Sequence, residues 1–453
     1  MTTEEFILEH RLDDVRQLAL RGCSDKSVDV PYALDQIAGW QTARKKLPTW
    51  AATDGIIYPP HLNMEQCSSE KTARYKQFSL TSSPSPSGEG SDYSGKQTFS
   101  QLIDLTGGFG VDFSFMSRSV DHAVYVERNE RLCEIAKHNF QELGLKNVEV
   151  VCGDGVEYLK SLEPIKSLDK LEDCNHKVQI SNFKFQSNHK FQISNFKFQS
   201  KIIFLDPARR DSNGHKVFGI EDCTPDVLAL KDELLAKADL VMIKLSPMLD
   251  WHAVVKAFGS CCREVHIVSV DNECKEVIAI LNNLTPSLSP SAEGSDYTVK
   301  LVCVNLLKDN EQQTVFNINR EDNRLSCPIV DDAETFQYLF VPNASIMKAG
   351  CFAEVADTYG VKMLDVNSHL FVGREDIKNF PGRRFAIVDI TTMNKKELKA
   401  KMKGLDKANI SVRNFPLSVA ELRKRLKLKD GGDAYLFATT VKGKHIILIT
   451  HSV

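Results

Sequence analysis

Short apolar runs alternate with amphipathic stretches through the middle of the chain, from about residue 100 to 308. Seven of these runs have the length of buried strands: 102–105, 123–126, 148–151, 202–205, 240–245, 265–270 and 299–306. Between most of them, apolar positions recur at helical spacing, as in 131–143 and 224–238. Strands that alternate with helices predict a doubly wound parallel α/β sheet of about seven strands.

The chain on either side of this alternation follows other patterns. Residues 1–79 are mostly helical by spacing, with helices predicted over 4–20 and 31–43. Residues 309–453 predict a separate α+β unit with elements at 338–341, 344–359, 384–390, 394–405, 409–415, 418–428 and 434–450. We therefore predict a helical region at 1–79, an α/β domain at 99–308 and an α+β domain at 309–453.

Two kinds of internal repeat interrupt these patterns. Residues 176–188 recur almost unchanged at 189–201, and residues 80–96 match 284–300 at 12 of 17 positions. The second pair is rich in Ser, Pro and Gly, a composition that does not bury a core. Each copy falls between predicted elements, where extra length costs little closure entropy. We interpret them as insertions at 80–98, about 165–201 and 284–298, with a surface hairpin favoured over a binding arm for the repeat at 176–201.

Composition adds three constraints. No apolar run reaches the roughly 18–20 residues of a membrane span, and the N-terminal sequence lacks the apolar core of a secretory signal. The 12 cysteines include no C-x-x-C pair, which favours reduced thiols over disulfides or a metal site. We therefore expect a cytoplasmic protein that binds neither a metal nor a membrane.

A glycine-rich turn follows the first predicted strand of the α/β domain. Asp104 ends that strand, and a turn containing Thr106, Gly107, Gly108 and Gly110 leads into a helix. Glycines let the backbone approach a ligand closely, and the next helix presents unpaired N–H groups. Taken alone, the turn is explained equally well as a tight strand–helix junction.

Acidic residues at the next two strand ends favour a ligand that contains adenosine. Glu127 ends the second strand, 23 residues after Asp104, where its carboxylate is placed to accept both ribose hydroxyls. Asp154, followed by Gly155, ends the third strand, where it is placed to accept from the adenine amino group while Val156 N–H meets a ring nitrogen. The alternative for Asp154 is a turn or helix cap.

The fourth and fifth strands end in residues placed to bind a second substrate, here called the acceptor. Asp206 ends the fourth strand, where it is placed to accept a hydrogen bond or a proton from an exocyclic amine. Pro207 removes a donor, which leaves nearby carbonyls free to point at the acceptor. Arg209 and Arg210 predict phosphate contacts, and Lys244 predicts a contact with the acceptor. The alternative for Asp206 is a salt bridge to a local arginine.

The motifs together resemble class I S-adenosylmethionine-dependent methyltransferases, and among these the bacterial ones with a C-terminal THUMP-like domain. The stretches that carry the resemblance are MEQCSSEKTARYK (64–76), DLTGGFGVD (104–112), LDPARRD (205–211), PNASIMKAG (342–350), NSHLF (367–371) and VRNFPLSVAELRKRLKLKDGGDAYLF (412–437). Thr106 replaces the first glycine of the class pattern, whereas a dinucleotide fingerprint would need a third glycine where Phe113 stands.

The resemblance implies a fold, a cofactor and a substrate class. The fold is a Rossmann-like seven-stranded methyltransferase sheet with an N-terminal helical region and a C-terminal THUMP-like or ferredoxin-like α+β domain. The cofactor is S-adenosylmethionine, and the substrate is RNA, either rRNA or tRNA. The resemblance also implies that a segment before the first strand lines the cofactor pocket, namely Ser68, Ser69, Glu70, Thr72 and Tyr75.

Charge supports the RNA interpretation independently of the resemblance. Between Thr391 and Asp430 the chain has 12 Lys or Arg against 4 Asp or Glu, although its net charge is −3. Such asymmetry is typical of a surface that meets a phosphate backbone. Within this stretch, Asn414 and Phe415 predict contacts with bases. The alternative is a solvated helix face.

We therefore predict a methyltransferase that uses S-adenosylmethionine to modify a nitrogen of an RNA base, with Asp206 and Pro207 at its catalytic centre. Two alternatives stay open at this point. One is a methyltransferase that acts on a protein or a small molecule. The other is a non-catalytic RNA-binding protein built on a methyltransferase scaffold.

Overall fold

The computed structural model describes residues 1–82, 99–165, 200–208, 219–283, 298–308, 311–319, 326–330 and 336–453. The chain divides into two compact units, the first made of Met1–Arg263 with Ile278–Ser289 and the second of Glu264–Val277 with Pro290–Val453. Most of the three predicted insertions, including the predicted hairpin at 176–201, lies outside the described residues. None of the described helices is long and apolar enough to cross a membrane.

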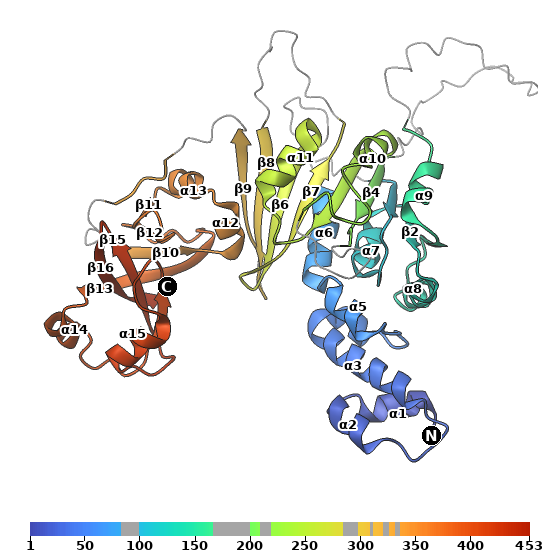
Figure 1. Ribbon diagram of the computed structural model, residues 1–453, viewed down its shortest axis with the longest axis horizontal. Coiled ribbons are helices and arrows are strands. Elements are labelled where there is room, and N and C mark those ends of the chain that lie inside the picture. Colours follow the sequence, from blue (N-terminus) through green and yellow to red (C-terminus); the bar gives the residue numbers. More distant parts are fainter. Residues whose placement is uncertain are drawn as a thin grey trace, which may run out of the picture. The chain divides into compact units, whose positions relative to one another are not determined.

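The N-terminal region is helical, but the single helix predicted over 4–20 is wrong, because two helices stand there. α1 (Thr3–His10) ends before Asp14, whose side chain accepts a hydrogen bond from Gln17 N–H and so caps α2 (Val15–Arg21). The helices that follow are α3 (Val30–Lys46), α4 (Pro48–Ala52), α5 (His61–Gln66) and α6 (Glu70–Ser82). In Figure 1 they succeed one another toward α6, which lies beside the sheet of the first unit.

Five parallel strands form the sheet of the first unit, and all five lie where the sequence predicts them. They are β1 (Gln101–Asp104), β2 (His122–Glu127), β3 (Val148–Cys152), β4 (Lys201–Leu205) and β5 (Leu240–Leu245). The helices between and after them are α7 (Val111–Met116), α8 (Glu130–Glu142), α9 (Gly155–Ser161), α10 (Lys231–Lys237) and α11 (Trp251–Phe258), with short 3-10 turns at Ser117–Ser119 and Gly259–Cys261. The helix predicted over 224–238 is shorter than expected.

The strand order places a ligand crevice at the end of β1. The order β3-β2-β1-β4-β5 puts β2 on one side of β1 and β4 on the other. From β1 the chain continues to β2 and β3 on one side, and it then returns to β4 and β5 on the other side of β1. Ligands of such folds bind outside the carboxyl ends of the strands at the point where the strand order reverses. The acidic strand ends singled out in the sequence all lie at this edge.

A buried cluster joins the N-terminal helices to the glycine-rich turn. Trp50, Tyr58 and Met64 come from the helical region, and they pack with Phe109 of the turn and Phe115 of α7. The rings of Trp50 and Phe109 lie 4.8 Å apart at 58°. The helical region and the sheet of the first unit thus share one hydrophobic core.

Four further strands follow, with most of their residues in the second unit, and the sequence prediction contains only some of them. These are β6 (Cys262–Val270), β7 (Glu273–Leu281), β8 (Thr298–Leu306) and β9 (Glu311–Asn319), where β8 pairs with β6 in parallel and with β9 antiparallel. β7 and β9 were not predicted. Asp271 and Asn272 connect β6 to β7 with φ of 48° and 65°, the backbone of a two-residue hairpin.

The predicted fold class is confirmed, with a larger sheet than expected. The described strands follow the order β3-β2-β1-β4-β5-β7-β6-β8-β9, which gives nine strands in place of seven. β9 begins at Glu311, after the boundary predicted at 308/309, and yet pairs with β8 along its whole length. The sheet therefore continues past that predicted boundary.

The rest of the second unit is an α+β structure around a seven-stranded sheet of order β11-β12-β10-β13-β16-β15-β14. Its strands are β10 (Tyr338–Pro342), β11 (Lys362–Met363), β12 (Phe371–Gly373), β13 (Gly382–Thr392), β14 (Asn409–Val412), β15 (Ala434–Val441) and β16 (Lys444–Ser452), with helices α12 (Ala344–Ala349), α13 (Phe352–Tyr359), α14 (Lys395–Lys401) and α15 (Val419–Leu426). The helix predicted over 344–359 is two helices, because Gly350 ends α12 with φ of 72°.

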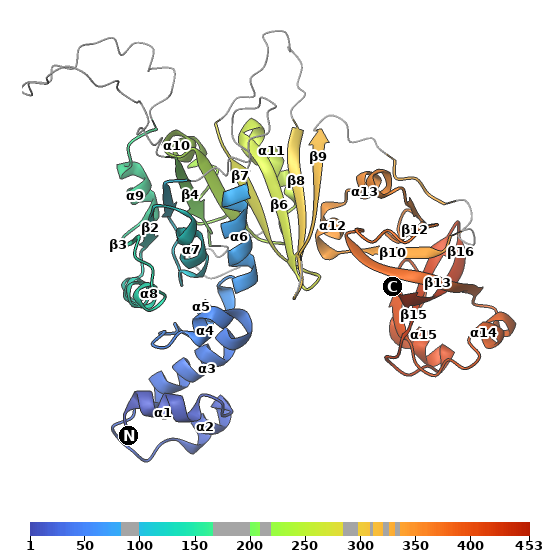
Figure 2. The same ribbon diagram turned by 180° about the vertical axis from the view of Figure 1, so that it is seen from behind.

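The two basic helices of this part pack on the sheet through their apolar faces. Leu398 of α14 and Leu422 of α15 contact a cluster that includes Leu436 of β15 and Ile447 of β16. Figure 2 shows both helices beside these strands. Because the apolar side chains face the sheet, the lysines of α14 and α15 face outward.

We expect the turn before α7 to tolerate no side chain at Gly110. Its φ is 82°, and a Cβ there would lie 2.7 Å from the ring of Phe140, whereas Gly144 has φ of 69° and open space around it. Gly144→Ala should therefore cost only the left-handed backbone penalty, about 1–2 kcal/mol. Gly110→Ala should cost a further amount of about 1–3 kcal/mol from overpacking. Urea unfolding of both variants measures the difference, and equal midpoints would contradict the packing argument.

Candidate active site

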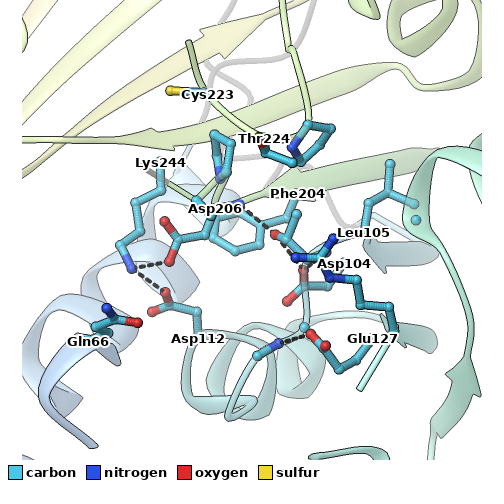
Figure 3. A pocket seen from close by; sticks show the side chains of 18 of the residues that line it. Gln66, Asp104, Leu105, Asp112, Glu127, Phe204, Asp206, Cys223, Thr224 and Lys244 are labelled. Atoms are coloured by element: carbon cyan, nitrogen blue, oxygen red, sulfur yellow. Dashed lines mark hydrogen bonds and ion pairs between the residues drawn. The ribbon is translucent and has the colours of Figure 1, made fainter. Parts of the chain in front are cut away.

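A cavity of about 960 Å³ opens at the carboxyl ends of the strands of the first unit. Its size is near the upper end of the range for small-molecule sites, which is about 300–1,000 Å³. Eleven residues singled out from the sequence line it: Asp104, Thr106, Gly107, Gly108, Gly110, Glu127, Asp154, Gly155, Asp206, Pro207 and Lys244. The structure therefore gathers both the cofactor-type and the acceptor-type motifs around one space (Figure 3).

The glycine-rich turn is shaped by the ring of Tyr125 behind it. A Cβ on Gly107 would lie 2.3 Å from that ring, so only glycine fits there. The Tyr125 hydroxyl donates to the carbonyl of Gly108, and burial raises the pKa of this phenol far above its ordinary value. The hydroxyl thus stays protonated and holds the turn against the sheet.

Glu127 already binds backbone on both sides of the cavity. Gly108 N–H donates to Oε2 and Asn129 N–H donates to Oε1, each at 2.9 Å. These bonds fix the carboxylate across the glycine-rich turn, and each oxygen has a second lone pair for a ligand. Binding of a ribose by Glu127 stays a prediction.

Asp154 caps a helix, which is the alternative that its sequence left open. Its Oδ1 accepts from Val156 N–H at 2.8 Å and from Glu157 N–H at 3.1 Å, so it starts α9. The expectation that Val156 N–H is available to an adenine nitrogen is therefore wrong, because that N–H is used in the cap. Gly155 follows with its Cα against the carbonyl of Leu105, where a Cβ would approach to 2.1 Å.

Asp104 is buried at the floor of the cavity, with 2% of its surface exposed. Burial raises the pKa of this carboxyl to about 8, although Thr106 N–H, which donates to Oδ1 at 2.9 Å, lowers it. The repulsion of Asp112, Asp206 and Glu127 acts in the same direction as burial. Asp104 is therefore protonated at neutral pH.

Asp206 is held at two points and remains open to the cavity. Its backbone N–H donates to Oγ1 of Thr106 at 2.6 Å, and its Oδ2 lies 2.6 Å from Nζ of Lys244. Its side chain is 40% exposed, against 13% for Lys244 (Figure 3). Asp206 thus forms a salt bridge with Lys244. The local arginines of the alternative, Arg209 and Arg210, fall outside the described residues.

Lys244 lines the cavity at the end of β5. Its ammonium contacts Asp206, Asp112 and Ser68. The sequence stretch at 64–76 contributes to this cluster through Ser68, which lines the cavity, and through Lys76, which is fully buried and lies 3.2 Å from Asp112. A contact between Lys244 and the acceptor stays a prediction.

Gln66 and Cys67 of that stretch also line the cavity, whereas the other residues expected to line it, Ser69, Glu70, Thr72 and Tyr75, are not in the lining. Glu70 accepts from Thr49 N–H and binds Arg74, and Tyr75 is buried in the core. Among the residues that line the cavity, Asp112 was not predicted. Its position in the motif at 104–112, eight residues after Asp104, was the available signal.

The structure describes only one of the three remaining predicted substrate residues. Arg209 and Arg210 fall outside the described residues. Asn414 belongs to the second unit, where its φ is 49° and its amide donates to Oδ1 of Asp365 at 3.3 Å. Within the described part of the chain, no group of three His, Cys, Asp or Glu side chains could hold a metal ion.

Three family models match successive parts of the chain. The model of protein-L-isoaspartate(D-aspartate) O-methyltransferases matches residues 69–168, a ferredoxin-like domain matches 338–381, and a THUMP domain-like model matches 382–452. A solved structure, a proposed methyltransferase from Porphyromonas gingivalis W83, is 27% identical with a TM-score of 0.76. The similarity covers 99% of this chain and 97% of that one.

The chain is a class I S-adenosylmethionine-dependent methyltransferase with a C-terminal THUMP-like domain. A curated relative, the protein-L-isoaspartate O-methyltransferase of Thermotoga maritima, is 34% identical over 92 residues, which are 20% of this methyltransferase. The match spans 29% of the length of that relative. The family match at 69–168 contains β1 to β3, the strands that carry the cofactor-type motifs, and ends before β4.

We expect Asp104 to make the stability of this methyltransferase fall as pH rises. Between about pH 4 and pH 8 the unfolded carboxyl has lost its proton while the folded one keeps it, so folding becomes less favourable, and the loss ends above about pH 8. The slope is at most about 1.4 kcal/mol per pH unit. Asp104→Asn keeps an acceptor for Thr106 N–H and should remove this slope. Urea unfolding from pH 5 to 9 checks it, and parallel curves for the two proteins would contradict it.

Proposed function

We propose that this methyltransferase transfers a methyl group from S-adenosylmethionine to a nitrogen of an RNA base, in the cytoplasm. The observation that carries the proposal is the placement of Asp206. Its carboxylate is fixed at the end of β4 and opens into the cavity that the glycine-rich turn and Glu127 also line. The 11 cysteines among the described residues are free thiols, which agrees with a reducing compartment.

Charge and shape of the cavity suit the cofactor. Its lining contains five acidic side chains besides the protonated Asp104 and two cationic side chains, Arg128 and Lys244, so it favours a positively charged ligand. S-adenosylmethionine supplies a methyl group activated by a sulfonium. We assign the ribose to Glu127, the adenine side to Asp154 and Gly155, and the remaining cofactor contacts to the turn and strand end before α7, namely Asp104, Thr106, Gly107, Gly108 and Gly110.

Asp206 would act on the methyl acceptor. An exocyclic amine that donates to the carboxylate is oriented with its lone pair toward the methyl group, and orientation of reacting atoms supplies much of the rate. As the new N–C bond replaces the bond between the methyl carbon and the sulfonium sulfur, the nitrogen must lose a proton, and the carboxylate is placed to accept it. Pro207 follows with no N–H of its own, so it adds no competing donor beside the acceptor.

The second unit supports RNA as the substrate. It contains the THUMP-like match, and THUMP-type domains are associated with RNA-modifying enzymes. Of the 12 basic residues between 391 and 430, ten are exposed: Lys395, Lys396, Lys399, Lys401, Lys403, Lys407, Lys424, Arg425, Lys427 and Lys429. A cationic surface of this size is typical of binding to a phosphate backbone. We assign Asn414, Arg209 and Arg210 to this substrate as well.

A protein substrate is the second candidate. The similarity to protein-L-isoaspartate O-methyltransferases favours it, but that similarity covers strands β1 to β3 and excludes Asp206. It therefore supports a shared cofactor rather than a shared acceptor.

Glu127→Ala should abolish binding of S-adenosylmethionine, because the ribose would lose its acceptor and the glycine-rich turn its tie to Gly108. Glu149→Ala is the matched control, since Glu149 lies on the neighbouring strand β3 and outside the cavity lining. Isothermal titration should give micromolar binding for the wild type and the control. Unchanged affinity in Glu127→Ala would remove Glu127 from the cofactor site.

Asp206→Asn should lower methyl transfer to RNA by roughly 10²-fold or more, the usual contribution of a positioned acid or base. Affinity for S-adenosylmethionine should stay close to that of the wild type. Labelled methyl transfer to total RNA measures the rate, and the same assay after ribonuclease treatment distinguishes an RNA from a protein acceptor. Full turnover in Asp206→Asn would exclude Asp206 from the reaction, and label in protein would favour the second candidate.

A further inference from the structure

Three oxygens from three parts of the first unit surround the ammonium of Lys244. It lies 2.6 Å from Oδ2 of Asp206, 2.9 Å from Oγ of Ser68 and 3.4 Å from Oδ2 of Asp112. An ammonium has three N–H donors, so these oxygens match its capacity. Figure 3 shows Lys244 between Asp206 and Asp112. The cation is largely covered, while the carboxylate of Asp206 stays open to the cavity.

Asp112 is itself fixed as an anion. Nζ of the fully buried Lys76 lies 3.2 Å from its Oδ1, and the Ser68 hydroxyl donates to its Oδ2 at 2.7 Å. Burial alone would raise the pKa of Asp112, but Lys76, Lys244 and Ser68 together hold that pKa below its ordinary value. The cluster therefore presents the negative charge of Asp112 to Lys244 in addition to that of Asp206.

We infer that Lys244 is a positioning residue for methyl transfer, which holds the Asp206 carboxylate toward the acceptor from a socket formed by Ser68, Asp112 and Lys76. This inference rests on the proposed function, in which Asp206 receives the acceptor amine. A carboxylate whose rotamer is locked before the acceptor arrives needs no reorganisation in the reaction.

The socket also assigns a role to the N-terminal helical region. Lys76 belongs to α6 and Ser68 lies just before that helix, so two of the three socket residues come from the chain that precedes β1. α6 packs against α7, which carries Asp112. The helical region therefore completes the reaction centre rather than only covering the sheet.

The decisive variant is Lys244→Met. Lys76 still neutralises Asp112 in it, and Asp206 is exposed enough to remain hydrated, so the fold should persist. We expect kcat to fall by roughly 10²-fold, the scale of a misplaced reacting group, with KM for S-adenosylmethionine and RNA within about twofold of wild type. Lys244→Arg keeps the charge and should recover part of the rate. Lys160→Met, which removes a cation from an exposed ion pair, is the control and should retain full activity.

Ser68→Ala provides a milder test that leaves every ion pair intact. It removes one of the oxygens around Lys244 and should lower kcat by about threefold to tenfold, with unchanged melting temperature, if the socket sets the orientation of Asp206. Wild-type kcat in both Lys244→Met and Ser68→Ala would overturn the inference. A raised KM for RNA with normal kcat would also overturn it, because Lys244 would then contact the substrate.

A structural readout separates this inference from the proposed function. A wild type that methylates no RNA would overturn the proposed function itself. Crystal structures of the wild type and of Lys244→Met would then decide the role of Lys244. We expect the Asp206 side chain to leave its wild-type rotamer in the variant, and the same rotamer in both structures would overturn the inference.

Discussion

The crowding of carboxylates at one edge of the sheet is the constraint on which the first unit depends. Parallel strands bring Asp104, Glu127 and Asp206 together at their carboxyl ends, and the helix after β1 adds Asp112. Four carboxylates around one cavity would repel one another strongly if all were ionised, because the site is partly removed from water. The fold relieves the repulsion differently at each residue, and these differences give the residues their separate roles.

Burial favours the protonated form of Asp104, so this side chain contributes no charge near neutral pH. Glu127 accepts hydrogen bonds from two backbone N–H groups, and its place across the glycine-rich turn suits it to a ribose. Asp112 and Asp206 are balanced by Lys76 and Lys244. The last of these arrangements leaves a carboxylate oxygen of Asp206 beside open space, which is where an acceptor amine would be received.

The N-terminal helical region takes part in this balance of charges. It delivers a buried lysine to the cluster, and it shares a hydrophobic core with the glycine-rich turn through Trp50 and Phe109. A buried lysine is costly without a partner, so Lys76 and Asp112 stabilise each other only when both elements are in place. Folding of the N-terminal helices and assembly of the cavity are thus coupled.

The sequence alone determined the strands, their acidic ends and the basic stretch of the C-terminal part. Periodicity located seven strands, because burial on both faces leaves continuous apolar runs, and the spacing from Asp104 to Glu127 and Asp206 placed all three at one edge. Local signals were present but missed for two broken helices and one hairpin, at Asp14, Gly350 and the Asp271–Asn272 turn. Each of these breaks depends on a single capping residue or a short turn. A prediction based on the period of apolar positions gives such single residues too little weight.

Tertiary structure decided which groups share the charges of the site. Lys244 pairs with residues 38, 132 and 176 positions away in the chain, and Lys76 lies opposite Asp112 only because α6 packs on α7. Motif spacing carries no information about such contacts, because they are set by packing between elements rather than by the order of residues. The partner of Asp206 and the protonation of Asp104 therefore followed from the folded chain alone.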